Sequence, residues 1–345
     1  MKRPAVSIVR FGAVSLRLRM RTLFVCGILL LTCLLLSVLL LGTGTLPFSI
    51  AEVLASLIGR GSDPLTEQVI TSLRLPRVLT ALLVGGALGM AGAIFQSISR
   101  NALGSPDVIG FTTGAATGAI MQIVLYKAGP VETSLAAVLS GMATATIVFL
   151  LSLRGRTTGG YRLILVGIGV GAMLSGVNTV LLVMGDLDQA ASAQLWLAGS
   201  LSTRTWSHVA PAAIGFALII PLVVFYARNL DLLEMGDNAS RQLGIHAERT
   251  RLLMVMAAVG LTSIATAAAG PIAFVALAAP QIARKLTASP SVPVVSGALM
   301  GATLLISADL LSQRLPLAGN MPIGLTTGLL GGVYLLWLLA RSKSI

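Results

Sequence analysis

Long apolar runs without a charged residue recur along this chain of 345 residues, and they decide what it can fold into. The first run extends from Thr22 to Leu41 and holds 20 uncharged residues, enough for an α-helix to cross the hydrocarbon core of a bilayer. Charged residues make up only 10% of the sequence, whereas soluble domains contain roughly 25%. Lipid is therefore the expected solvent for much of the surface.

Segments that cross lipid must satisfy their backbone N–H and C=O groups internally, which for single apolar runs means an α-helix. We therefore expect an all-α, polytopic membrane protein with about ten transmembrane helices in a single domain over residues 1–345. The ten expected spans are 22–41, 78–98, 108–126, 133–153, 163–184, 206–227, 252–269, 271–283, 292–313 and 322–340. Residues 1–21 form a basic tail, and we expect the first span to be retained because no small-residue cleavage site follows it.

The number of spans depends on whether the stretch 252–283 forms one long kinked span or two. It contains no charge, and Gly270-Pro271 interrupts it near the middle. Ten spans with a cytoplasmic N-terminus place 18 Lys and Arg inside and 6 outside, whereas nine spans place 15 inside and 9 outside. Because basic residues favour the cytoplasmic side, ten spans with both termini in the cytoplasm are expected.

Chemistry-bearing residues are scarce within the expected spans. Asp309 is the one acid clearly inside an apolar run, and we expect it to pair near the outer end of its helix, with Arg314 as the candidate partner, rather than to relay protons. His208 and His246 lie outside the runs, and no catalytic pair or metal-ligand cluster is recognisable, so we expect neither an enzyme nor a metal site. No phosphate-binding loop of the G-x-x-x-x-G-K-[ST] type occurs, so any ATP and Mg²⁺ must bind to another chain.

The segment 228–251 is amphipathic, and Gly236 and Gly244 divide it into short helical pieces. The charge distribution places it in the cytoplasm. It is either an interfacial helix that lies on lipid headgroups or a docking helix that transmits movement from a partner subunit.

Arg74 and Arg77 precede the second span on the side that the positive-inside rule makes external. They either anchor the chain to headgroups or bind carboxylates of a delivery protein. Arg314 lies in another outward segment and could join them.

Several motifs together resemble the FecCD-type permeases of iron–siderophore and cobalamin importers, and they extend over roughly residues 45–340. The motifs are Arg74-Leu-Pro-Arg77-Val with Gly85-Gly-Ala-Leu-Gly89, Asn101-Ala-Leu-Gly104-Ser-Pro106-Asp107, Leu233-Glu234-Met-Gly236-Asp-Asn-Ala-Ser-Arg-Gln-Leu243-Gly244, Ala269-Gly270-Pro271-Ile-Ala-Phe274, and Asn320-Met-Pro322-Ile-Gly324.

The resemblance implies a type II ABC importer permease bundle in the bacterial inner membrane. It implies a second permease subunit, two cytoplasmic ATP-binding subunits and a periplasmic or lipoprotein substrate-binding protein. The implied cargo is an iron–siderophore, such as ferric enterobactin or another catecholate; the alternative is an ion-coupled secondary transporter of a small solute. No nucleic acid and no cofactor bound by this chain are expected.

The resemblance also implies roles for individual residues. Arg74, Arg77 and Arg314 would dock the substrate-binding protein, and Gly160 and Tyr161 would form a cytoplasmic gate. The coupling residues toward the ATPase would be Glu234, Gly236, Asp237, Ala239, Leu243 and Gly244. The chain departs from the usual pattern at Ala102, where the family has proline, and at Gln281, where it has histidine.

Overall fold

The computed structural model describes residues 6–11, 14–61, 63–154, 157–158, 160–314 and 321–341. Each apolar run that the sequence singles out corresponds to one α-helix. These are α1 (Met20–Gly42), α4 (Leu75–Ser99), α5 (Phe111–Tyr126), α6 (Pro130–Ser152), α7 (Gly160–Met184), α9 (Trp206–Glu234), α11 (Ala247–Ala269), α12 (Val275–Thr287), α13 (Val294–Arg314) and α14 (Ile323–Arg341).

Seven helical segments in the described residues are long and apolar enough to cross a membrane, and α5 and α14 contribute shorter apolar helices. The stretch 252–283 is broken into α11 and α12, as the sequence predicts. Gly270 ends α11 with a φ of +74°, and Phe274 adopts the left-handed conformation before α12 begins. The chain therefore reverses at this point instead of continuing as one kinked helix.

Short elements occupy the polar connections. They are α2 (Ile50–Leu57), α3 (Pro64–Gln68), the π-helix η1 (Val69–Arg74), the 3₁₀ helix η2 (Pro106–Ile109), α8 (Leu187–Leu197) and α10 (Asp237–Gln242). The fold is all-α as predicted, and two short antiparallel strand pairs accompany the helices: β1 (Val6–Phe11) with β2 (Val14–Arg19), and β3 (Leu153–Arg154) with β4 (Thr157–Thr158). Alternating valine and leucine in the basic tail favour this hairpin over a helix.

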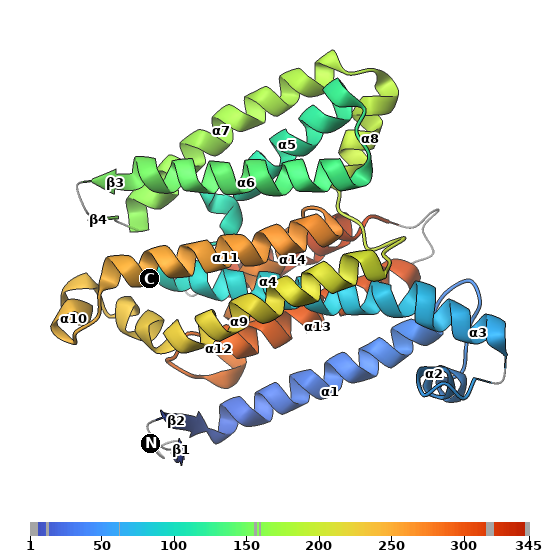
Figure 1. The fold of residues 1–345 in the computed structure, drawn as a ribbon. Helices are drawn as coiled ribbons and strands as arrows, with labels where there is room; N and C mark the ends of the chain where they lie inside the picture. The colour runs from blue at the N-terminus through green and yellow to red at the C-terminus, as the bar shows by residue number, and fades with distance from the viewer. Residues whose placement is uncertain are drawn as a thin grey trace.

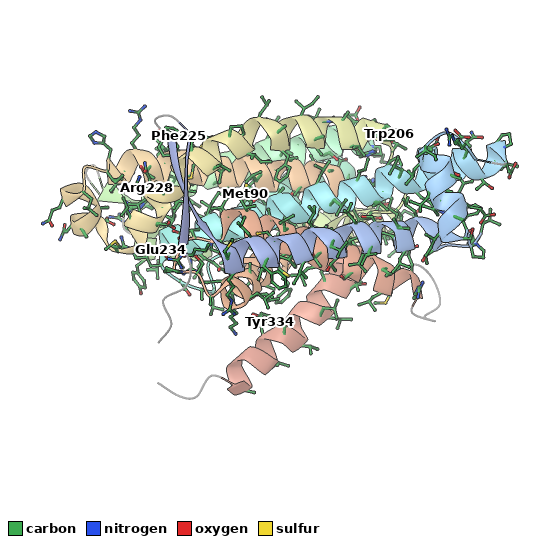
Figure 2. The ribbon with its side chains drawn as sticks, turned by 90° about the horizontal axis from the view of Figure 1, so that it is seen from below. Met90, Trp206, Phe225, Arg228, Glu234 and Tyr334 are labelled. Atoms are coloured by element: carbon green, nitrogen blue, oxygen red, sulfur yellow. The ribbon has the colours of Figure 1, made fainter. Side chains whose placement is uncertain are left out.

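The bundle has two distinct ends. Figure 1 shows β1–β2, β3–β4 and α10 at one end, and α2, α3 and α8 at the other. In Figure 2, Arg228 and Glu234 lie at the first end and Trp206 at the second. The segments that the charge pattern assigns to the cytoplasm thus lie together, opposite those that it assigns to the exterior.

Helix α4 lies at the centre of the bundle, between α9, α11, α12 and α13 (Figure 1). Glycines allow this close packing: a methyl group added at Gly89 or Gly92 would overlap the carbonyl oxygens of Gly297 and Ala276. Small residues at such crossings let helix backbones approach closely. By contrast, α14 projects away from the other helices in Figure 2 and exposes large apolar side chains, including Leu329 and Val333.

Candidate functional site

The short helix α10 is set between two glycine turns. Gly236 has a φ of +112° and Gly244 a φ of +80°, conformations that side-chain-bearing residues rarely adopt. A β-carbon at either position would have no neighbour within 4 Å. The glycines are thus required for the backbone path and not for close packing, and they make α10 a separate piece joined to the bundle at two turns.

The Asp237 carboxylate binds two arginines from different helices. Arg251 of α11 donates from Nη2 to both carboxylate oxygens at 3.0 and 3.1 Å, and Arg100 donates from Nη2 to Oδ1. Arg100 ends α4, and its Nε also donates to the carbonyl of Leu233 at 3.2 Å. We call Asp237, Arg100 and Arg251 the Asp237 clamp.

Electrostatics favour the charged form of this clamp. Only 3% of the Arg251 side chain is exposed, and its Nη1 lies 2.7 Å from Glu248. Burial raises the pKa of Asp237, but the charges and hydrogen bonds of Arg251 and Arg100 outweigh burial and hold that pKa below its ordinary value. The carboxylate is therefore ionised and bound to both guanidinium groups near neutral pH.

The six predicted coupling residues do not share one environment. Leu243 is exposed, as is the neighbouring Met235, whereas Ala239 is half-buried. Glu234 binds Arg284 of α12 at 2.7 Å. The segment consequently has an outward side that mixes apolar residues with polar ones such as Arg241 and Gln242, and an inward side whose acids pair with arginines.

At the opposite end, Arg74 holds the turn that follows α1. It donates from Nη1 to the carbonyl of Leu41 at 2.7 Å and from Nη2 to that of Leu46 at 2.5 Å. Its guanidinium also lies 4.6 Å from the ring centroid of Phe48. Arg74 thus has a structural role in addition to any contact with a partner.

Arg77 pairs with Asp309, which corrects the expected pairing of Asp309 with Arg314. The Asp309 oxygens accept from Nε and Nη2 of Arg77 at 3.0 and 2.5 Å. Packing decides the pairing, because α4 and α13 lie side by side and bury Asp309 between them. Arg314, at the end of α13, is exposed.

The Arg77–Asp309 pair borders a cavity of about 370 Å³ at this end of the bundle, and Ser200 and Ser202 also line it. The predicted gate lies at the other end. There α7 begins at Gly160, and the Tyr161 side chain is 76% exposed.

The sequence profile of the FecCD transport family matches residues 29–341. The chain belongs to this family. It is 44% identical over 324 residues to the ferric enterobactin transport system permease protein FepG of Escherichia coli, with 94% of this chain and 97% of FepG aligned. It is 34% identical to the Fe(3+)-citrate import system permease protein YfmE of Bacillus subtilis, over 94% of this chain and 96% of that protein.

A solved structure of an ABC transporter has a similar fold. An inward-facing metal-chelate type ABC transporter superposes with a TM-score of 0.83 and 28% sequence identity, covering 92% of this chain and 99% of that one. The helical arrangement of this FecCD chain is therefore that of an ABC transporter permease.

Ala102 and Gln281, at which the resemblance implies a departure from the family pattern, contact each other. Gln281 of α12 donates from Nε2 to the carbonyl of Ala102 at 2.7 Å. Its Oε1 lies 3.5 Å from the Tyr334 hydroxyl of α14. Gln281 thus ties the turn after α4 to two further helices, a relation that neither departure indicates on its own.

The sequence does not single out Arg100 or Arg251, because an arginine beside an apolar run also satisfies the positive-inside rule. Asp237, one of the predicted coupling residues, binds both of them with its carboxylate.

Proposed function

We propose that this chain is one of two permease subunits of an ATP-driven importer that carries a ferric siderophore of the catecholate class into the cell. The observation that carries the proposal is the alignment with FepG, which extends over 97% of that ferric enterobactin permease at 44% identity. The iron(III)-citrate permeases are related at lower identity, 34% for YfmE and 36% for FecD of Escherichia coli. A catecholate complex is therefore the preferred cargo over citrate.

We further propose that the chain crosses the inner membrane ten times, with both termini in the cytoplasm. The charge distribution along the sequence supports this topology. The grouping of α10 with β3–β4 at one end, and of α2, α3 and α8 at the other, is also what alternating crossings require (Figure 1). The end with α10 would then face the cytoplasm.

The two ends would have different partners. A substrate-binding protein would dock at the outer end, where Arg314 offers an exposed charge and Arg74 and Arg77 lie nearby. Two ATP-binding subunits, which hold ATP and Mg²⁺, would dock at the cytoplasmic end on the exposed face around Leu243. The turn at Gly160 and Tyr161 would close the pathway there.

An ion-coupled mechanism finds less support. A coupling ion needs a carboxylate within the bundle that is free to bind and release it. The buried acid of α13, Asp309, is instead held by two hydrogen bonds from Arg77.

Reconstitution tests this function. The chain would be placed in proteoliposomes with its second permease, ATPase and substrate-binding subunits, and uptake of ⁵⁵Fe-enterobactin would be measured. Uptake should require ATP and should cease with an ATPase subunit that cannot hydrolyse it. Uptake driven by a proton or sodium gradient without ATP would contradict the mechanism, and transport of ferric citrate but not ferric enterobactin would contradict the cargo.

A further inference from the structure

Residues 234–244, which we call the coupling segment, have one side that is exposed and one side that faces the bundle. Met235 and Leu243 are exposed to 66% and 58%. Ser240 is fully buried, and its hydroxyl donates to the carbonyl of Asp237 at 3.0 Å. Asp237 points toward the bundle and binds Arg100 and Arg251. A docked partner would therefore meet the exposed side, which carries Leu243 together with Asn238 and Arg241, while Asp237 acts inside the permease.

Asp237 joins α10 to helices that are distant in sequence. Arg251 belongs to the first turns of α11, and Arg100 is 137 positions before Asp237 at the end of α4. Arg100 has a φ of +50°, a backbone conformation that glycine or asparagine tolerates better. The backbone of Arg100 is thus held in an unusual conformation, and its guanidinium donates hydrogen bonds to both the end of α9 and the start of α10.

The same end of α4 has further links to its neighbours. Gln96 donates from Nε2 to the carbonyl of Leu277 in α12 at 2.9 Å, and Ser97 lies 3.5 Å from the carbonyl of Leu230 in α9. Because α4 is the most buried of the long apolar helices in the described residues, a displacement of this end moves the centre of the bundle.

We propose that Asp237 is a positioning residue that fastens the coupling segment to α4 and α11 through Arg100 and Arg251, so that movement of a docked ATPase reaches the central helix. The proposal rests on the proposed function only in assigning the moving partner to an ATPase. Gly236 and Gly244 set α10 off from α9 and α11 by two turns, and the bonds of the Asp237 clamp join this short helix to α4 and α11. Docking itself belongs to the exposed face around Leu243.

The first test measures the clamp without substrate or ATPase. Spin labels on Leu103→Cys and Arg241→Cys, both exposed positions, would report the distance between the end of α4 and α10 in nanodiscs, with Cys26 and Cys33 replaced by alanine. We expect a narrow distribution in the parent and in Asn238→Ala, a matched control on the exposed side of α10. Asp237→Asn and Arg100→Gln should broaden it, and Asp237→Glu should restore much of it. Unchanged distributions in Asp237→Asn would overturn the proposal.

The second test measures coupling in the assembled importer. Asp237→Asn should retain co-purification with the ATPase subunits while uptake per ATP hydrolysed falls about 5-fold or more, the range in which sites in proteins are coupled. Leu243→Glu should instead abolish co-purification. Loss of the ATPase in Asp237→Asn, or unchanged uptake per ATP, would refute the proposal. If the parent binds no ATPase, the proposed function fails, and the distance measurement still decides the clamp.

Discussion

The guanidinium of Arg77 and the carboxylate of Asp309 form a two-bond ion pair although 232 positions separate them in the chain. The pair is asymmetric, because 21% of the Arg77 side chain but only 1% of the Asp309 side chain is exposed. A partly exposed cation that loses its partner can turn to water, whereas a buried carboxylate cannot.

This asymmetry predicts unequal effects of removing the two partners. Arg77→Ala should lower stability by about 3 kcal/mol, because it leaves a buried charge uncompensated. Asp309→Asn should cost about 1 kcal/mol, since the arginine can still donate to the amide oxygen. The double variant Arg77→Met/Asp309→Leu should be more stable than Arg77→Ala alone. Thermal unfolding of the detergent-solubilised protein would measure this order, and equal losses in both single variants would contradict it.

The close approach of α4 to α12 predicts that Gly92 tolerates no β-carbon. A methyl group there would overlap the Ala276 carbonyl, which belongs to the backbone and cannot rotate away. Gly92→Ala should therefore cost about 1–3 kcal/mol, as overpacked cores do. The matched control is Gly27→Ala in α1, where a β-carbon meets nothing within 4 Å. The control should unfold at or above the temperature of the parent, and a stable Gly92→Ala protein would count against the packing described here.

The outer arginines should separate into structural and docking residues. Arg314 is exposed, whereas Arg74 holds the turn after α1 through two carbonyls. Charge reversal of Arg314 to glutamate should weaken binding of the substrate-binding protein about 10-fold, or about 1.4 kcal/mol, without changing the unfolding temperature. Arg74→Glu should lower both the affinity for the substrate-binding protein and the unfolding temperature. Surface plasmon resonance and thermal unfolding would distinguish them, and normal binding by Arg314→Glu would remove Arg314 from the docking surface.

The Asp237 clamp should open only in acid. The pKa of Asp237 lies below its ordinary value of 3.8. The stability that the ionised carboxylate adds to the folded protein is therefore fully present above pH 3.8, and it is lost as the pH falls through the lowered folded-state pKa. The charged groups around this carboxylate are Arg100 and Arg251, with Glu248 beside Arg251. The spin-label distance between positions 103 and 241 should therefore stay narrow from about pH 8 to about pH 5. Broadening near neutral pH would contradict the ionised clamp.

Much of the helical framework follows directly from the sequence, because lipid solvation imposes one conformation on every uncharged run. The predicted span 78–98 lies within α4, Leu75–Ser99, and the break at Gly270-Pro271 separates α11 from α12. The polar connections were less predictable. The basic tail pairs as a hairpin, and α2, α3 and η1 are three short helices between Ile50 and Arg74. In water a polar segment can be helix, strand or loop, so local packing selects its conformation.

Partners across the bundle could not be deduced. The sequence offers Arg314 as the nearest cation to Asp309, but the helix surfaces that face each other place Arg77 there. Likewise, the amphipathic pattern of 228–251 identifies a segment with two faces without showing which residues of the bundle its acid meets. Arg100 and Arg251 become recognisable only when α4, α10 and α11 converge at one end.

The π-helical turn η1 has a consequence for the register of the outer end. Residues 69–74 widen the path of an otherwise continuous helical segment from Pro64 to Ser99, and such turns accommodate one residue more than an α-helix. Because the extra residue is taken up within this one turn, deleting it would restore α-helical winding with little rotation of the upstream residues relative to α4, whereas a deletion in a regular α-helix rotates them by about 100°. Arg77 and Asp309 would keep their phase, and α2 and α3 would keep their direction around the axis, so this turn is the place in the segment where the outer surface tolerates the loss of one residue.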